Sequence, residues 1–192
     1  MSRAVFACLL VLAGCATTSV STGPTSWPQH VAAISDIDQW HIEGKIGFSA
    51  PGERGSATLV WDQDNNRFDL TLSGPFGIGT TRLSGTGELA TLIHDDRTLQ
   101  APASDLAEYT TGLRVPVDTL IWWVRGLPDP NAPSHISFDG LGLPTSLKQH
   151  DWQVDYQRYQ NTQLGPLPGK LVVTRDGYKL TLVINRWELP AQ

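Results

Sequence analysis

The sequence predicts a mainly β fold, a strongly curved antiparallel sheet whose open side is covered by two short helices. Two observations carry this prediction. Apolar and polar residues alternate along most of the chain, which is the period of a sheet with one buried face. The alternation stops between about residues 104 and 124, where apolar residues recur at helical spacing instead.

The first half of the predicted sheet is a meander of short strands, preceded by a short helix over residues 29–34. Alternation covers residues 40–48, 57–61 and 68–72, and the turns Pro51-Gly52 and Asn65-Asn66 separate these segments. Shorter strands are expected at 79–83, 88–94 and 98–100, with Asp95-Asp96 as a turn.

The interruption predicts two short amphipathic helices. Ser104 is suited to cap the first, which Gly112 closes, and Pro116 is suited to the first turn of the second, which ends before Gly126. Strands resume after it, and Asp176-Gly177 is a strong hairpin signal. These later strands are expected at 136–138, 145–149, 152–157, 169–174 and 178–187, which gives around ten strands in one domain.

The N-terminal residues predict export and a membrane tether. Arg3 precedes the apolar run 4–12, which is shorter than the ~20 residues of a bilayer-spanning helix. Leu12-Ala13-Gly14-Cys15 resembles a bacterial lipobox, which implies cleavage before Cys15 and lipid attachment to its thiol. The alternative is a soluble secreted protein with a cysteine there by chance. Residues 1–14 are therefore predicted to be a signal peptide, 15–28 a lipidated N-terminus and flexible tether, and 29–192 the folded domain.

Charge and motifs narrow the class of protein. Removal of residues 1–14 takes Arg3 from the 14 Lys and Arg residues, and the 13 that remain face 19 Asp and Glu, a formal charge of −6. No basic stripe is present, which argues against nucleic acid as a partner. No nucleophile elbow, zinc-binding helix motif or phosphate loop occurs, so we predict no enzyme activity, no metal and no cofactor. His94-Asp95-Asp96 is the richest polar cluster, and its adjacent positions favour a solvated turn over a metal site.

Two apolar features leave alternatives open. Seven Trp residues fit either a solid aromatic core or an apolar cavity between sheet and helices that holds lipid. In Gly74-Pro75-Phe76-Gly77 a single large apolar residue stands among turn formers, which predicts that Phe76 lies at a loop tip. The alternative is that this loop folds back and Phe76 plugs the core. Burial of one Phe in a bilayer is favourable by ~1.5–3 kcal/mol, enough to bias a tethered protein toward the surface.

Four segments resemble, in the same order, the LolB family of outer-membrane lipoprotein receptors. They are Gly44-Lys45-Ile46-Gly47, residues 55–59 with Trp61, residues 67–70 with 72–77, and residues 123–128. The resemblance implies an incomplete, unclosed antiparallel β-barrel with a short α-helical lid around an apolar cavity. It also implies that Gly74, Pro75, Phe76 and Gly77 form a membrane-insertion loop, with Phe76 where the family usually has Leu.

The resemblance further implies a receptor that takes acylated lipoproteins from the soluble periplasmic carrier LolA and inserts them into the outer membrane. We expect a monomer anchored in that membrane and facing the periplasm, whose cavity binds acyl chains by non-directional apolar contact. A lipoprotein that binds another amphiphile, such as a phospholipid or glycolipid, and a structural envelope lipoprotein are the alternatives. The residues predicted to line the cavity are Trp61, Phe68, Leu70, Leu106, Leu120 and Trp123.

Overall fold

The computed structural model describes residues 26–74 and 79–190, which form eleven strands and three helices. The strands of the first half are β1 (Gln39–Ala50), β2 (Glu53–Asp64), β3 (Arg67–Ser73), β4 (Thr80–Gly85), β5 (Ala90–His94) and β6 (Arg97–Ala101). Those of the second half are β7 (His135–Phe138), β8 (Pro144–Gln149), β9 (Trp152–Thr162), β10 (Gly165–Arg175) and β11 (Tyr178–Glu188). Helix α1 (Trp27–Ile34) precedes β1, and α2 (Ala103–Thr111) and α3 (Val117–Trp123) lie between the two halves.

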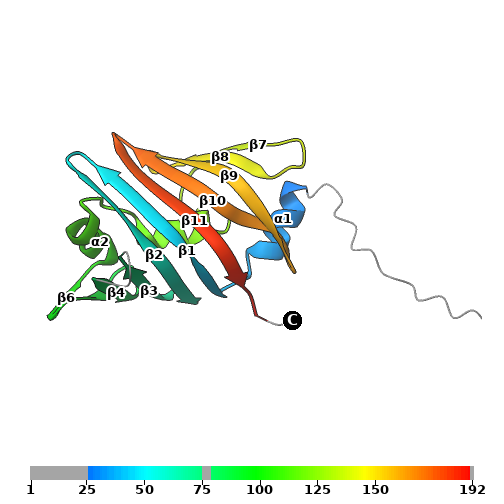
Figure 1. The fold of residues 1–192 in the computed structure, drawn as a ribbon. Coiled ribbons are helices and arrows are strands. Elements are labelled where there is room, and N and C mark those ends of the chain that lie inside the picture. Colours follow the sequence, from blue (N-terminus) through cyan, green and yellow to red (C-terminus); the bar gives the residue numbers. More distant parts are fainter. Residues whose placement is uncertain (1–25, 75–78, 191–192) are drawn as a thin grey trace, which may run out of the picture.

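All eleven strands belong to one antiparallel sheet. Its order is β6-β5-β4-β3-β2-β1-β11-β10-β9-β8-β7, so each half is a meander and the pairing of β1 with β11 joins them. Strands β6 and β7 are the two edges, and the sheet curves without closing (Figure 1). This arrangement confirms the predicted unclosed antiparallel barrel, with eleven strands where about ten were expected.

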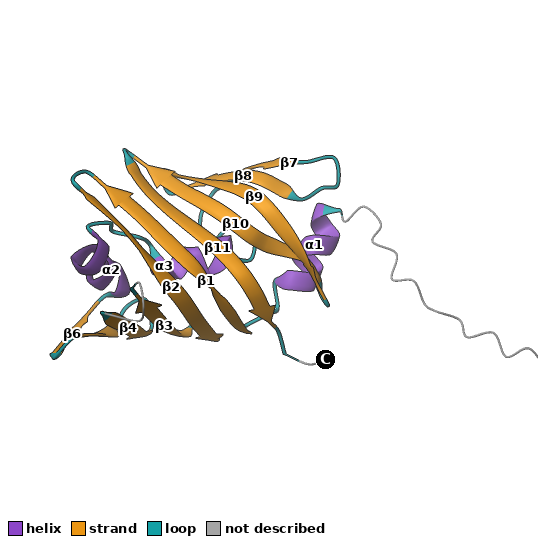
Figure 2. Ribbon diagram, in the orientation of Figure 1, coloured by secondary structure: helices purple, strands orange, loops and turns teal. Residues whose placement is uncertain are grey.

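The helices lie against the concave face of the sheet. Figure 2 shows α3 behind β1, β2 and β11, with α2 beside the first meander and α1 beside the second. Alternate residues of the strands point into the layer between sheet and helices, as Trp40 and Ile42 do on β1 and Leu59 and Trp61 do on β2. One hydrophobic core fills this layer.

Turn chemistry in the structure agrees with the sequence at the tight hairpins. Asn65 (φ 54°) and Asp95 (φ 51°) take left-handed conformations between β2 and β3 and between β5 and β6. Asp176 (φ 47°) and Gly177 (φ 83°) connect β10 to β11, as expected of an Asp-Gly hairpin. Gly112 closes α2 with φ 68°, which a residue without a Cβ adopts readily.

Several predicted boundaries are wrong. Helix α2 begins two residues earlier than expected, with Pro102 at the N-cap in place of Ser104. The N–H of Ala103, the first helical residue, reaches the carbonyl of Gly87 at 2.9 Å, so a capping side chain is not needed for it. Strand β10 begins at Gly165 instead of 169, because the sheet accommodates Pro166 and Pro168 beside a register shift in the β9–β10 pairing.

Helix α1 begins at Trp27, two residues before the predicted start of the domain. The indole ring of Trp27 packs against the ring of Phe138 with centroids 5.2 Å apart. The predicted signal peptide, Cys15 and most of the predicted tether lie outside the described residues. Over residues 26–74 and 79–190, no helix has the length and apolar character needed to cross a membrane.

Candidate functional site

An apolar cavity of about 70 Å³ lies between the concave face of the sheet and the two helices of the central segment. The sheet side of its wall consists of Ile46, Leu59, Trp61, Leu70, Leu72, Thr81, Leu83, Leu92, Leu180 and Leu182. The helical side consists of Ala107, Thr110, Thr111, Val115, Val117 and Leu120. The lining therefore comes from five neighbouring strands of the first meander, from β11, and from both α2 and α3.

The three threonines in this lining do not make the cavity polar. Thr110 and Thr111 each donate their hydroxyl to a carbonyl of their own helix, at 2.8 Å, to Leu106 and Ala107 respectively. The hydroxyl of Thr81 lies 2.7 Å from Nδ1 of His94 on the neighbouring strand. With the hydroxyls bonded elsewhere, the cavity offers a ligand only apolar contact, which suits a hydrocarbon chain.

The cavity is too small for an acyl chain as it stands. A volume of about 70 Å³ corresponds to roughly two water molecules at ~30 Å³ each. Sites for drug-sized ligands are ~300–1,000 Å³. A hydrocarbon ligand therefore requires part of the wall to move, and the helical side is the part that the sheet hydrogen bonds do not hold.

Helix α2 is held to the sheet almost entirely by apolar contact. Among the described residues, its one side-chain hydrogen bond to the sheet joins Nη1 of Arg97 on β6 to the hydroxyl of Tyr109, at 3.5 Å and exposed to solvent. The side chains of Asp105 and Glu108 pair instead with Arg114 in the loop that follows. Its first residue, Ala103, is held at the backbone by the carbonyl of Gly87. The rest of the helix can leave the sheet without breaking a buried side-chain hydrogen bond to it.

Helix α3 is fastened by a buried arginine just beyond its end. The guanidinium of Arg125 donates to the carbonyls of Ile37 at 2.6 Å and Ile121 at 3.2 Å, and it lies 4.5 Å from the ring centre of Trp122. Burial lowers the pKa of Arg125 to about 10, so the group still carries its charge at neutral pH. These bonds tie α3 to the connection between α1 and β1.

A buried glutamine ties the other side of α3 to the second meander. Oε1 of Gln149 on β8 accepts from Nε1 of Trp123 at 3.0 Å and from the backbone N–H of Asp129 at 2.9 Å. Its Nε2 donates to the carbonyls of Asp129 and Ala132, so both ends of the amide are paired. The hydroxyl of Tyr156 donates to the carbonyl of Trp123 at 3.0 Å.

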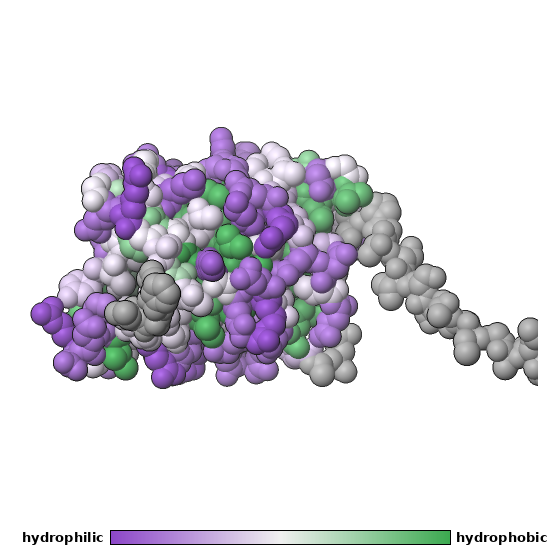
Figure 3. All heavy atoms as spheres, in the orientation of Figure 1, coloured by the Kyte–Doolittle hydropathy of each residue, from purple (hydrophilic) through white to green (hydrophobic). Residues whose placement is uncertain are grey.

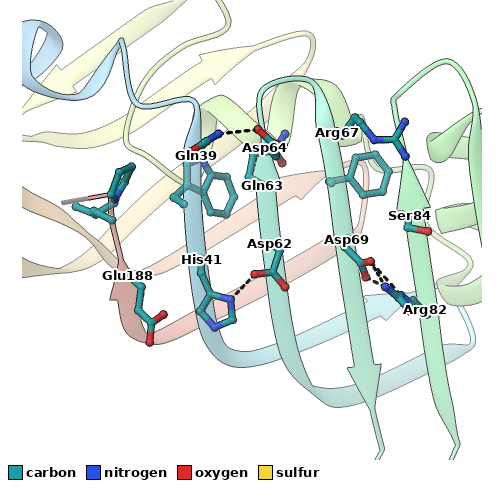
Figure 4. A pocket seen from close by; sticks show the side chains of 14 residues that line it. Gln39, His41, Asp62, Gln63, Asp64, Arg67, Asp69, Arg82, Ser84 and Glu188 are labelled. Carbon is teal, nitrogen blue, oxygen red and sulfur yellow. Dashed lines mark hydrogen bonds and ion pairs between the residues drawn. The ribbon is translucent and has the colours of Figure 1, made fainter. Parts of the chain in front are cut away.

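Charged and polar side chains line another hollow of the surface. This hollow, of about 790 Å³, lies where β1 to β4 and β11 meet at one end of the sheet (Figure 4). In it Nδ1 of His41 lies 2.6 Å from a carboxylate oxygen of Asp62, and Arg82 pairs with Asp69 on the neighbouring strand. These charges are paired with one another across the strands, so this hollow offers no apolar site.

The predicted cavity residues fall into two groups. Trp61, Leu70 and Leu120 lie on the wall of the cavity. The other three, Phe68, Leu106 and Trp123, are buried in the core away from that wall. Phe68 lies at the end of β3 and borders the polar hollow instead, and the indole N–H of Trp123 is used by Gln149.

Several lining residues were missed by sequence reasoning. Leu180 and Leu182 alternate on β11 and face the cavity because β11 pairs with β1, with Leu182 opposite Ile46. Their alternation was visible, but their approach to β1 depends on a pairing between the two ends of the chain. Val115 and Val117 flank Pro116 at the start of α3 and also line the cavity. The helical spacing that predicted Leu120 as a lining residue includes Val117 as well.

Other predicted site features lie at a turn or outside the described residues. His94 bonds to Thr81, and Nε2 of His94 lies 3.6 Å from a carboxylate oxygen of Asp95. Within 26–74 and 79–190, no group of three His, Cys, Asp or Glu residues is arranged to hold a metal ion. Gly74 ends the described part of the connection after β3, whereas Pro75, Phe76 and Gly77 lie outside the described residues, as does Cys15.

These features define a class of protein, an open β-barrel with an apolar cavity under a helical lid. Solved structures share the fold. A LolA superfamily protein from Nitrosomonas europaea superposes with a TM-score of 0.55 at 8% identity, covering 87% of this chain and 94% of that one. A DUF1329 family protein from Desulfovibrio piger superposes with a TM-score of 0.56 at 8% identity, covering 88% and 95%.

Sequence comparison identifies the family within this class. The family model for outer membrane lipoprotein LolB matches residues 38–187. The outer-membrane lipoprotein LolB of Ectopseudomonas mendocina is 37% identical over 192 residues, covering 96% of this chain and 94% of the relative. That of Stutzerimonas stutzeri is 38% identical over 187 residues, covering 93% and 91%. The chain belongs to the LolB family.

Family membership fixes the cellular place and the general role. The chain is a lipid-anchored lipoprotein of the outer membrane that faces the periplasm, and it functions as an outer-membrane lipoprotein receptor. The family is one of lipoprotein carriers and receptors, which implies exchange with a LolA carrier and with lipoprotein cargo. The alternative of a lipoprotein for another amphiphile is not favoured.

Proposed function

We propose that this chain takes the acyl chains of lipoproteins from a LolA-like carrier into the cavity under α2 and then releases them into the outer membrane. The observation that carries the proposal is a cavity wall without a free polar group, roofed by a helix that no buried side-chain hydrogen bond joins to the sheet. Such a site binds by hydrocarbon contact alone, and it accepts cargo whatever the protein sequence attached to the lipid.

The cavity opens by movement of α2 while α3 stays in place. Helix α3 is held by the charged bonds of Arg125 and the amide bonds of Gln149, and breaking either leaves buried polar groups unpaired. Helix α2 loses apolar contacts with the sheet when it moves, and the acyl chain forms apolar contacts with the same side chains in their place. Each methylene removed from water contributes ~0.8 kcal/mol, so a few methylenes offset the opening.

No nucleotide is needed for transfer in this scheme. The chain moves from carrier to receptor if the open cavity here binds it more tightly than the carrier does. It then moves to the bilayer, which offers a larger apolar volume than either protein. The affinity of the receptor must therefore be intermediate, and Cys15, as the proposed lipidation site, keeps the receptor beside the membrane that takes the product.

A reversible cross-link across the lid tests the proposal. A Cβ atom built on Gly112, at the end of α2, lies 3.6 Å from Cβ of Ala50 at the end of β1. Disulfides have Cβ atoms ~3.5–4.5 Å apart. In a soluble Cys15→Ala background, Ala50→Cys with Gly112→Cys gives the mature chain one thiol pair. The nearby carboxylate of Glu53 must turn away, which an exposed side chain can do.

We expect the oxidised protein to bind a fluorescent fatty acid at least about tenfold more weakly, because the open form is no longer populated. Reduction restores binding. The two single-cysteine variants under the same oxidant control for the left-handed conformation at Gly112 and for oxidation itself. Equal affinity of the oxidised and reduced double variant contradicts the opening of α2.

Release into the bilayer is assigned to the loop at Gly74, Pro75, Phe76 and Gly77. Phe76 keeps the apolar character that insertion requires, and a charge at this position opposes entry into a hydrocarbon layer. We expect Phe76→Glu to accept cargo from a loaded carrier and to transfer it poorly to outer-membrane vesicles. Equal transfer by Phe76→Glu and the unmodified chain removes this role from the loop.

A further inference from the structure

We propose that the tip of the β7–β8 hairpin, together with Trp27, rests on the phospholipid surface to which the chain is tethered. This contact is separate from the loop at Phe76 and from the cavity under α2. It would make the tether end of the domain a docking face, so that the barrel meets the membrane in one orientation.

The hairpin tip presents its apolar residues to solvent. The side chain of Leu141 is 56% exposed and that of Phe138 is 42% exposed, although both are large and apolar. Phe138 packs on the ring of Trp27, whose centroid is 5.2 Å away, so the two elements form one surface. Figure 3 shows apolar side chains gathered beside the point where the N-terminal segment, drawn in grey, meets the domain.

The turn holds Leu141 outward by its own hydrogen bonds. One carboxylate oxygen of Asp139 accepts from the backbone N–H groups of Leu141 and Leu143, each at 2.9 Å. The N–H of Asp139 in turn reaches the carbonyl of Leu143 at 2.9 Å. A tip built in this way keeps an exposed leucine in place, whereas an unsupported loop could fold it against the domain.

The charge around the tip favours a phospholipid surface. Residues 26–34 and 133–147 contain one carboxylate, that of Asp139, and its bonds to two backbone N–H groups direct it into the turn. His135 and Lys148 lie opposite each other at the end of the hairpin away from the turn, and His30 in α1 is buried. The face therefore carries little that an anionic headgroup would repel.

The tether brings this face to the membrane. Ten residues lie between Cys15 and Ser26, so the start of α1 stays within ~40 Å of a lipid anchored at Cys15. Trp27 follows directly. A tethered surface meets the bilayer at a high effective concentration, so an apolar patch too small to bind alone makes contact for much of the time.

Vesicle binding of the unlipidated chain tests the contact. The protein is the mature chain with Cys15→Ala, and the vesicles contain phosphatidylethanolamine with phosphatidylglycerol as the minor lipid. We expect Leu141→Ser to lower the partition constant about tenfold, since one leucine no longer enters the apolar layer. Leu89→Ser is the matched control, because Leu89 is 62% exposed and lies in the turn before β5.

A fluorescent label locates the contact in the tethered protein. Cys15 is the only cysteine after residue 14 and carries the lipid, so Leu141→Cys provides a single free thiol for an environment-sensitive dye. We expect the dye at 141 to be quenched by spin-labelled lipids in proteoliposomes and the dye at 89, from Leu89→Cys, to remain in water. This readout involves no cargo, so it is independent of the proposed transfer function.

Three results would overturn the proposal. Unchanged vesicle binding by Leu141→Ser shows that the tip does not contribute. An equal loss with Leu89→Ser shows that any exposed leucine suffices. Concentration-dependent dimers that Leu141→Ser abolishes show that the face covers a second copy of this chain instead of a membrane.

Discussion

The two helices that roof the concave face are held by different forces. Helix α2 lies over the first meander and contacts it through apolar side chains such as Ala107, with one exposed side-chain hydrogen bond from Arg97 to Tyr109. Helix α3 is held by buried hydrogen bonds at its C-terminal end. Arg125, just after the helix, donates to the carbonyl of Ile37, and Trp123, its last residue, donates to Gln149. Apolar contacts can be exchanged for contacts with a lipid, whereas buried polar bonds cannot.

The difference explains why the cavity lies where it does. Polar bonds of α3 require fixed geometry, and the core beside them is filled by Trp123, Trp152 and Tyr156. Under α2 the wall is built mainly from aliphatic side chains, and a space of about 70 Å³ remains between them. In the proposed opening, α3 is therefore the fixed part of the roof and α2 is the part that moves.

The largest expected effect comes from Arg125, the main polar fastening of α3. We expect Arg125→Ala to lower the free energy of unfolding by about 3 kcal/mol, because the buried carbonyls of Ile34 and Ile37 lose a charged donor. Urea denaturation measures this loss. Arg186→Ala is the control, since Arg186 pairs with Glu43 and Glu188 in solvent and its loss should cost less than ~1 kcal/mol. Similar losses for both variants would remove the distinction between the two helices.

The second effect concerns the cavity under α2. Ala107→Leu adds apolar volume to the helical wall, and we expect affinity for a fluorescent fatty acid to fall about tenfold while the free energy of unfolding changes by less than ~1.5 kcal/mol. Ala33→Leu, on the exposed side of α1, is a control of the same chemistry. Full affinity in Ala107→Leu would indicate that acyl chains bind elsewhere on the concave face.

The smallest effect concerns pH at the polar end of the sheet. Burial by itself lowers the pKa of His41, but the hydrogen bond and charge of Asp62, with Glu43 and Glu188, outweigh it and raise the pKa. A raised pKa means that the contribution of His41 to stability is present below its unfolded value of about 6.5 and is lost as pH rises through the folded value.

We therefore expect His41→Gln to lower the free energy of unfolding by about 0.5 kcal/mol or less near pH 5.5 and by nothing measurable near pH 8.5. Burial lowers the pKa of His30, so the contribution of His30 to stability changes with pH in the opposite direction. His30 is present in both proteins, so its contribution cancels when the variant is compared with the unmodified chain. In an Asp62→Asn background the dependence on pH should shrink. If His41→Gln loses more stability at pH 8.5 than at pH 5.5, the pKa of His41 is not raised by folding.

Much of the fold could be predicted because its signals are local. The alternation on β1 and β2, the Asp176-Gly177 hairpin and the glycine at the end of α2 each reflect neighbouring residues, and the structure confirms them. Errors occur where a distant contact replaces a local rule. The carbonyl of Gly87 serves the start of α2, so the expected serine cap is not used.

The cavity was harder to predict than the sheet. Alternation places Phe68 and Leu70 on the same face of β3, and both are indeed directed into the core. It does not say how far along the concave face a space remains, so Leu70 lines the cavity while Phe68 borders a polar hollow. Leu180 and Leu182 reach the cavity only because β11 pairs with β1.

The sequence by itself determined the strand order within each meander, the place of the two central helices and the predicted signal for lipid attachment at Cys15. These features depend on periodicity, turn residues and short motifs, all of which act over a few residues. The tertiary structure alone decided that buried side-chain hydrogen bonds hold α3 and that none joins α2 to the sheet. Arg125 and Gln149 bond to backbone groups that lie far away in the chain or in a loop without regular structure, and no local pattern specifies such partners.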